Sequence, residues 1–339
     1  MTILTRQRPP FRRAILAALL LVLGVAGSAL AAPPSLGIPI DCAMGERCFI
    51  QNYVDHESGP GRRDYACGRL SYDGHTGTDF RLPDLPAMEK GVPVVAAAAG
   101  VVQAARDEVP DVDMRDVEPE AIRNRELGNA VILDHGDGWQ TSYGHLRRGS
   151  VVVKPGERVE AGRVLGMVGL SGKTMFPHVH FEVRQNSRPV DPFVGPTTVD
   201  GCAAPRQPLW SAGAQAKLAY QESAGLVAGF ATQRPDAEQA RRGAYRDEAL
   251  GPNPETLVYW VDVLGTIAGD ETRFRIMAPD GRVILDNTAR LDGSNVSWFG
   301  FNGVKRPPTG WSPGSYRGSF TLTRRGKTVV ELERRVELR

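Results

Sequence analysis

The feature that most constrains the fold is a succession of short β-type runs, punctuated by glycine, between about residues 65 and 195. Runs of β-branched and aromatic residues bounded by turn residues predict strands. Asp137-Gly138 stands between two of these runs and predicts a tight hairpin turn. We therefore expect a mostly β chain that contains a compact antiparallel sheet. The expected strands are 92–102, 130–133, 140–143, 163–168 and 178–183.

The rest of the chain divides by composition. Residues 106–128 are rich in charge and poor in large apolar side chains, which indicates a surface insertion with a short helix starting near Pro119. A strand is expected at 226–232, inside a stretch rich in proline, alanine and glycine. From residue 257 the alternation returns together with hairpin turn sequences. This pattern predicts a small β-sandwich of immunoglobulin-like type.

The first 31 residues have the features of a secretion signal. An arginine-rich start is followed by an apolar run over 14–27 and by Ala29-Leu30-Ala31, which fits a cleavage site. A membrane anchor is the alternative, but the apolar run is short and ends in small residues. Cleavage would remove four arginines and leave 37 basic against 39 acidic side chains, so the electrostatic argument for a nucleic-acid partner disappears. We expect a periplasmic or secreted protein with no membrane span after cleavage.

Export changes the interpretation of the four cysteines. Cys42, Cys48, Cys67 and Cys202 have no C-x-x-C spacing, and an oxidising compartment favours disulfides over thiolate metal sites. Four cysteines allow three pairings. We favour Cys42 with Cys48 and Cys67 with Cys202, and free buried thiols are the alternative.

The stretch "SGKTMFPHVHFEV", residues 171–183, has two incompatible interpretations. Gly172-Lys173-Thr174 resembles the end of a phosphate-binding loop, which requires the pattern G-x-x-x-x-G-K-[ST]. The first glycine of that pattern would fall on Met167, and Pro177 and a β-type run follow where the phosphate-binding helix should begin. The nucleotide interpretation is therefore rejected.

The alternative is a metal site. His178 and His180 are two apart on a predicted strand, so both side chains point to one face. "GHTGTDF" adds His75 and Asp79, and "SYGHL" adds His145. Histidine and aspartate are suitable zinc ligands, and three protein ligands leave a fourth position for water, as catalytic zinc sites do. Taken singly, each histidine would more often be a core or capping residue.

In combination, these motifs resemble those of the lysostaphin-like (LytM-type) zinc endopeptidases of peptidoglycan, over about residues 70–193. The signatures are H-x-G-x-D, a lone histidine on a central strand, and H-x-H. The resemblance implies one Zn²⁺ per chain, held by His75, Asp79 and His180. It also implies that His145 and His178 are catalytic without being primary ligands. Two imidazoles and one carboxylate would leave the zinc site positively charged, which lowers the pKa of a bound water toward about 7.

Several neighbouring residues are weaker candidates. Glu182 lies on the strand face of His180 and is either a second-shell partner of a ligand ring or a plain surface carboxylate. Tyr72 and Tyr143 are possible oxyanion donors. His135 and His56 are interpreted as structural or solvated.

One departure from the family pattern concerns the substrate groove. The family usually has small residues before the final Pro-His, whereas this chain has Met175 and Phe176. That difference affects groove width and substrate preference. The insertion at 106–128 could line or cover the cleft.

The leading hypothesis is an exported zinc endopeptidase that cuts peptide stems or cross-links of peptidoglycan. The resemblance suggests a D-alanyl–diaminopimelyl cross-link in a Gram-negative periplasm. The alternatives are a non-catalytic LytM-type regulator of cell-wall amidases and a secreted protease acting on glycine-rich proteins. Peptidoglycan is the expected partner, and the C-terminal domain is a binding or positioning module or has a simple structural role. The expected division is a signal peptide 1–31, an N-terminal segment 32–64, the peptidase domain 65–200, a linker with one strand 201–255 and the β-sandwich 256–339.

Overall fold

The computed structural model describes residues 1–4, 32–197, 201–202 and 205–339. Most of the expected signal peptide, residues 5–31, lies outside the described residues. In the described part of the chain, no helix is long and apolar enough to cross a bilayer. Residues Pro33–Arg339 form one compact unit by their contacts.

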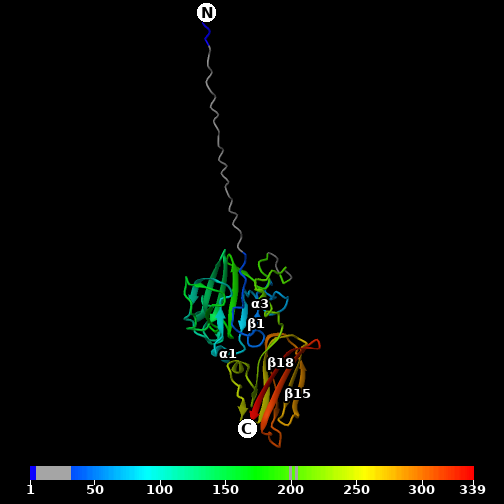
Figure 1. The fold of residues 1–339 in the computed structure, drawn as a ribbon. Helices are drawn as coiled ribbons and strands as arrows, with labels where there is room; N and C mark the ends of the chain where they lie inside the picture. Colours follow the sequence, from blue (N-terminus) through cyan, green and yellow to red (C-terminus); the bar gives the residue numbers. More distant parts are fainter. Residues whose placement is uncertain (5–31, 198–200, 203–204) are drawn as a thin grey trace. The chain divides into compact units, whose positions relative to one another are not determined.

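The first half of this unit is built on an eight-stranded antiparallel sheet (Figure 1). Seven strands follow the order β1-β2-β9-β6-β5-β4-β7, and β10 pairs with β9. A separate two-stranded sheet joins β3 to β8. This architecture confirms the expected mostly β, antiparallel fold. The strands are β1 (Phe49–Asn52), β2 (Thr78–Arg81), β3 (Pro93–Val95), β4 (Gly100–Arg106), β5 (Asn129–Gly136), β6 (Trp139–Leu146), β7 (Arg158–Val159), β8 (Val164–Met167), β9 (His178–Gln185) and β10 (Arg188–Val190).

The predicted hairpin turn is confirmed. Asp137 and Gly138 are the two residues between β5 and β6, with φ of 49° and 77°. Positive φ at both positions is what a two-residue turn of type I′ requires, because its twist matches that of the flanking strands. The turn sets the register of β6, which carries His145.

The single strand expected at 92–102 is wrong, because the structure has two strands there, in different sheets. β3 pairs with β8, whereas β4 pairs with β5 and β7. Between them, the N–H of Ala96 donates to the carbonyl of Arg163, and the N–H of Ala97 donates to the hydroxyl of Tyr143. Because these N–H groups bond to loop and side-chain acceptors, they form no strand pairing here. Alanine also has a low preference for strands, so the interruption costs little.

The core of this half draws on residues far outside the expected peptidase domain. Leu36 and Trp210 are both buried in it. The N–H of Leu36 donates to Leu209, and the N–H of Ser211 donates back to Leu36, each at 2.8 Å. The structure has the two disulfides that the sequence analysis favoured, Cys42–Cys48 and Cys67–Cys202. The helical elements of this half are α1 (Leu85–Glu89), the 3₁₀ helix η1 (Met114–Asp116), α2 (Pro119–Ile122) and α3 (Ala212–Gln215).

The second half is a β domain with two sheets, as expected. One sheet has the order β11-β13-β16 and the other has the order β12-β18-β17-β14-β15. Their core contains Phe230, Tyr259, Phe274 and Phe320, contributed by strands of both sheets. The elements are β11 (Ala224–Ala231), α4 (Ala237–Arg241), β12 (Ala249–Leu250), β13 (Thr256–Thr266), β14 (Glu271–Met277), β15 (Val283–Arg290), β16 (Asn295–Lys305), β17 (Gly314–Arg324) and β18 (Lys327–Leu338).

Candidate metal centre and its neighbouring histidines

Three buried side chains meet on one face of the large sheet. Asp79 on β2 and His180 on β9 are direct partners in the antiparallel register, and His75 lies in the turn before β2. Asp79 Oδ1 is 2.9 Å from His180 Nδ1 and 3.2 Å from His75 Nε2, and the two nitrogens are 3.2 Å apart. One ligand atom from each residue lies within 4.8 Å of the other two, as a metal site requires.

The end of strand β1 and the residue that follows it orient two of these side chains. His75 Nδ1 is 2.7 Å from the carbonyl of Tyr53, so Nδ1 carries the proton and Nε2 presents its lone pair to the site. Asn52 donates to Asp79 Oδ2 at 2.8 Å and leaves Oδ1 facing the two imidazoles. Hydrogen bonds of this kind fix the tautomer and the direction of side chains that bind metals.

Gly77 explains the glycine in the H-x-G-x-D motif. A Cβ at this position would lie 2.6 Å from Cε1 and Nε2 of the His180 ring. That distance is shorter than any ordinary contact, so a side chain there would displace His180. The glycine is therefore required by the close approach of the His180 ring.

The charges of the cluster fit a divalent cation. Burial lowers the pKa of His75, but the charge of Asp79 and its hydrogen bond outweigh burial, and the pKa rises above its usual value. Burial raises the pKa of Asp79, but the imidazoles of His75, His178 and His180 hold that pKa well below its usual range. Both shifts favour positive charge where the lone pairs converge. Two imidazole nitrogens and a carboxylate oxygen are donors that zinc accepts.

His178 and His145 lie beside this cluster. Their rings are 4.6 Å apart between centroids, and His178 Nε2 is 3.4 Å from Asp79 Oδ1. His145 Nδ1 is 2.7 Å from the carbonyl of Ser171, and His178 Nδ1 is 2.9 Å from the carbonyl of Phe176. With Nδ1 protonated by these bonds, a neutral ring has its lone pair on Nε2. Burial, together with the neighbouring imidazoles of His178 and His180, lowers the pKa of His145 well below its usual value, so this ring is neutral.

A strained backbone places His145. Strand alternation would direct it to the core face together with Tyr143, which packs on Phe181. His145 instead has φ of 58°, a left-handed conformation that is uncommon for residues other than glycine. That conformation brings its ring to His178. Backbone strain of this type is typical of functional sites.

The stretch once compared with a phosphate-binding loop positions these two histidines. Gly172 has φ of 83°, and a Cβ there would clash with the backbone of Gly128 in the 106–128 insertion. The turn exposes the Ser171 carbonyl to His145. The Thr174 hydroxyl donates to the Phe176 carbonyl at 2.9 Å and lies 3.2 Å from His178 Nδ1.

The weaker candidates lie in different places. The Tyr72 ring is 4.3 Å from that of His75, at the edge of the site. Glu182 lies on the expected face of β9, but its carboxylate pairs with Arg184 at 3.0 Å. The Tyr143 hydroxyl accepts from the N–H of Ala97 at 2.8 Å inside the core, which argues against the suggested oxyanion role.

The two remaining histidines have structural partners. His135 is bonded to the carbonyl of Ala99 and the hydroxyl of Thr141, and His56 is 2.7 Å from Asp191. Sequence reasoning missed Asn52, Tyr53, Ser171 and Thr174. Asn52 has no motif around it, and the contributions of Tyr53 and Ser171 are backbone carbonyls, which every residue type has.

Comparison with known proteins identifies the part of the chain that contains this site. Residues 73–192, which include the five-residue constellation, match the family described as Peptidase family M23. The DD-carboxypeptidase/endopeptidase Mpg of Neisseria meningitidis is 34% identical over 120 residues, which cover 35% of this chain and 22% of that protein. Peptidoglycan DD-endopeptidase ShyA of Vibrio cholerae is 33% identical over 117 residues, which cover 34% of this chain and 22% of that protein. The chain therefore matches about a fifth of the length of these relatives.

Among solved structures, a zinc containing peptidase from Vibrio cholerae is 28% identical, with a TM-score of 0.27. The alignment covers 43% of this chain and 39% of that one.

Proposed function

We propose that this chain, whose residues 73–192 form a domain of peptidase family M23, is an exported zinc-dependent endopeptidase that hydrolyses peptide cross-links or stems of peptidoglycan. The observation that carries the proposal is the convergence of His75, Asp79 and His180 next to His145 and His178 on one sheet face. The substrate class comes from relatives named peptidoglycan DD-endopeptidases. The expected D-alanyl–diaminopimelyl cross-link is the bond we propose.

His75, Asp79 and His180 would hold the zinc ion through Nε2, Oδ1 and Nδ1. A bound zinc ion would supply Lewis acidity there, to polarise a peptide carbonyl and lower the pKa of a water. His178 and His145 each have Nδ1 bonded to a backbone carbonyl, so Nε2 of a neutral ring can accept a proton from the attacking water. A ring protonated in this way can donate to the developing oxyanion or to the leaving amine.

Export to the periplasm is part of the proposal. The signal-type sequence of residues 1–31 and the two disulfides suit an oxidising compartment outside the cytoplasm. We assign the C-terminal β domain to binding or positioning of the substrate. We propose that the peptidase domain extends beyond 65–200, because its core includes Leu36 and Leu218.

The alternative of a non-catalytic regulator is disfavoured by a specific observation. A regulator has no need of ligand atoms, whereas this chain has all five site residues and the partners that orient them. A protease of glycine-rich proteins shares the same metal chemistry and differs only in substrate.

The experiment that tests the function uses the mature full chain and intact sacculi, with and without a chelator. Mass spectrometry of the released muropeptides should show chelator-sensitive loss of cross-linked dimers. Cleavage of an added elastin-like protein without any change in the sacculi would support the glycine-rich substrate instead.

A further inference from the structure

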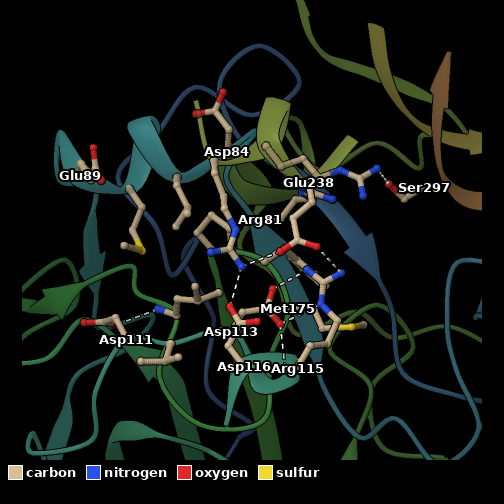
Figure 2. A pocket seen from close by; sticks show the side chains of 18 of the residues that line it. Arg81, Asp84, Glu89, Asp111, Asp113, Arg115, Asp116, Met175, Glu238 and Ser297 are labelled. Carbon is tan, nitrogen blue, oxygen red and sulfur yellow. Dashed lines mark hydrogen bonds and ion pairs between the residues drawn. The ribbon is translucent and has the colours of Figure 1, made fainter. Parts of the chain in front are cut away.

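A cavity of about 390 Å³ adjoins the proposed reaction centre. Arg81 on β2 is the register partner of His178 on β9, on the same face of the sheet. The Phe176 ring stacks on the His178 ring at 4.5 Å, and the Arg81 guanidinium lies 4.8 Å from the centre of the same ring. A row of contacting side chains therefore runs from His178, one of the proposed catalytic histidines, through Phe176 to Arg81. Figure 2 shows Arg81 projecting into this cavity, which we call the Arg81 pocket.

Arg81 is a buried cation whose hydrogen bonds go to neutral groups. It is only 2% exposed. Nε donates to the carbonyl of Leu82 at 3.0 Å, Nη1 donates to Gln51, and Nη2 donates to the carbonyl of Pro83 at 3.5 Å. A guanidinium has five N–H groups, so one on Nη1 and one on Nη2 remain. In the described part of the chain, no carboxylate forms an ion pair with it.

The charge on Arg81 persists at neutral pH. A guanidinium is protonated at any pH at which a protein stays folded. A buried charge is costly unless it is paired. The two remaining N–H groups are donors for an anion, and a carboxylate has two oxygens that can accept from them.

None of the described acidic side chains of the Arg81 pocket pairs with Arg81. Asp111 accepts hydrogen bonds from the N–H groups of Leu170 and Arg148. Glu89 is exposed at the rim. The other acids pair with different arginines, as Asp84 with Arg246, Asp113 with Arg115, Asp116 with Arg242, and Glu238 with Arg115 and Arg242.

We propose that the Arg81 pocket binds the free carboxylate of a stem-peptide residue close to the scissile bond, which makes Arg81 a specificity-determining residue. This inference rests on the proposed function. Met88 and Leu170 give the pocket apolar walls that suit a small aliphatic group such as the methyl group of alanine. The volume lies near the lower end of ligand pockets, about 300–1,000 Å³, and suits one or two residues.

The second half of the chain helps to enclose the Arg81 pocket. Glu238, Arg241 and Arg242, in and next to α4, also line it. Arg241 is itself held by Asp262 of β13 at 2.7 and 2.8 Å. The C-terminal domain therefore contributes to substrate choice directly, by forming one wall of the pocket.

The test measures binding to the full chain by titration calorimetry. The probes are N-acetyl-D-alanyl-D-alanine and its C-terminal amide, which differ only in the carboxylate. The acid should bind at least about tenfold more tightly than the amide, as expected for a charge-assisted bidentate contact. Arg81→Met should abolish this preference, and Arg81→Lys, which keeps the charge without the guanidinium, should retain part of it.

A second pair of variants does not depend on substituting a buried residue. Met175 lines the pocket and is 52% exposed, so Met175→Glu adds a carboxylate that competes for Arg81. It should weaken binding of the acid about tenfold. Val152 is 55% exposed and does not line the pocket, so Val152→Glu is the matched control and should bind like the parent chain.

Binding is measured apart from hydrolysis, so the two proposals fail separately. Equal affinity for acid and amide, no binding at millimolar acid, or an unchanged preference in both Arg81→Met and Met175→Glu would overturn the pocket proposal even if sacculi are digested. Intact sacculi with the predicted binding pattern would overturn the endopeptidase and leave a carboxylate-binding pocket.

Discussion

Asp79 and Asp262 are both buried carboxylates on β-strands, one in each half of the molecule, and their partners differ in kind. Asp262 receives two hydrogen bonds from Arg241, at 2.7 and 2.8 Å. Asp79 is surrounded by His75, His178 and His180. A guanidinium is always charged, whereas an imidazole with a directed lone pair is a ligand. The charge of Asp262 is therefore balanced within the chain, and that of Asp79 lies among imidazoles that could share a metal ion with it.

The same contrast holds for the two halves as a whole. The C-terminal domain has a second pair of this kind, because Arg324 binds Asp270 at 2.8 Å. The sequence has no histidine after His180. The two halves share antiparallel sheets and aromatic cores, so architecture alone does not distinguish a reactive site from a structural one. The distinction lies in the partner of each buried acid, which is an imidazole for Asp79 and a guanidinium for Asp262.

The largest effect expected from this contrast comes from matched substitutions of the two acids. Asp79→Asn should lose bound zinc and all measurable hydrolysis while the sheet stays folded, because a neutral amide is a poor zinc ligand. Asp262→Asn should keep zinc and lower the free energy of unfolding by about 1–3 kcal/mol, because Arg241 loses its counter-ion. Metal analysis and urea unfolding measure both. Stoichiometric zinc in Asp79→Asn would contradict the proposal that Asp79 binds the metal and Asp262 only an arginine.

The boundary between the halves can be tested by truncation. Trp210 and Leu218 are buried in the core of the first half, and Cys202 pairs with Cys67. A chain ending near Asp200 should therefore aggregate or lose cooperative unfolding. A chain ending near Glu222 should fold, hold zinc and hydrolyse small stem peptides. Circular dichroism and metal content distinguish the two, and a stable zinc-bound chain ending at Asp200 would show that the later segment is dispensable.

A smaller effect is expected from the disulfides. The Cys67–Cys202 bond closes a loop with a sequence separation of 135 residues, whereas the separation for Cys42–Cys48 is 6. In the chain-entropy model, replacing the first pair with serines costs about 4–5 kcal/mol and replacing the second costs about 2 kcal/mol. Denaturant unfolding gives both values. Intact-mass analysis of native protein with alkylation should find no free thiols, and four alkylated cysteines before reduction would contradict the pairing.

Local patterns in the sequence were enough to predict part of the site. His178 and His180 lie on one face because strand side chains alternate, and both are found there. Asp137-Gly138 predicted its hairpin because few other pairs adopt positive φ at both positions. In each case the information lies within a few residues of the feature.

Features that depend on distant segments could not be predicted in this way. His145 is turned by a left-handed backbone that packs against residues of the 106–128 insertion, and alternation alone would have placed its ring in the core. Asn52 reaches Asp79 only because β1 pairs with β2. In the sequence, Arg81 has no feature that distinguishes it from other strand residues. Its surroundings come from Phe176 and from the second half of the chain.

The measurement that tests the central claim most directly compares His180→Ala with His178→Ala. Both residues lie on β9 and face the same site, yet only His180 is placed among the three ligand atoms. Each variant is purified and its zinc content by plasma emission is paired with its turnover on muropeptide dimers. His135→Ala serves as control, because that ring bonds only to Ala99 and Thr141 among the described residues.

His180→Ala should lose most of its zinc, because one of three protein ligands is gone. His178→Ala should keep near-stoichiometric zinc, with turnover reduced about 10²–10⁴-fold for a lost acid–base group, and His145→Ala should behave alike. His135→Ala should retain both zinc and turnover. A His178→Ala variant that loses zinc while His180→Ala retains it would reverse the assigned roles. Full zinc and full activity in both variants would contradict the metallopeptidase itself.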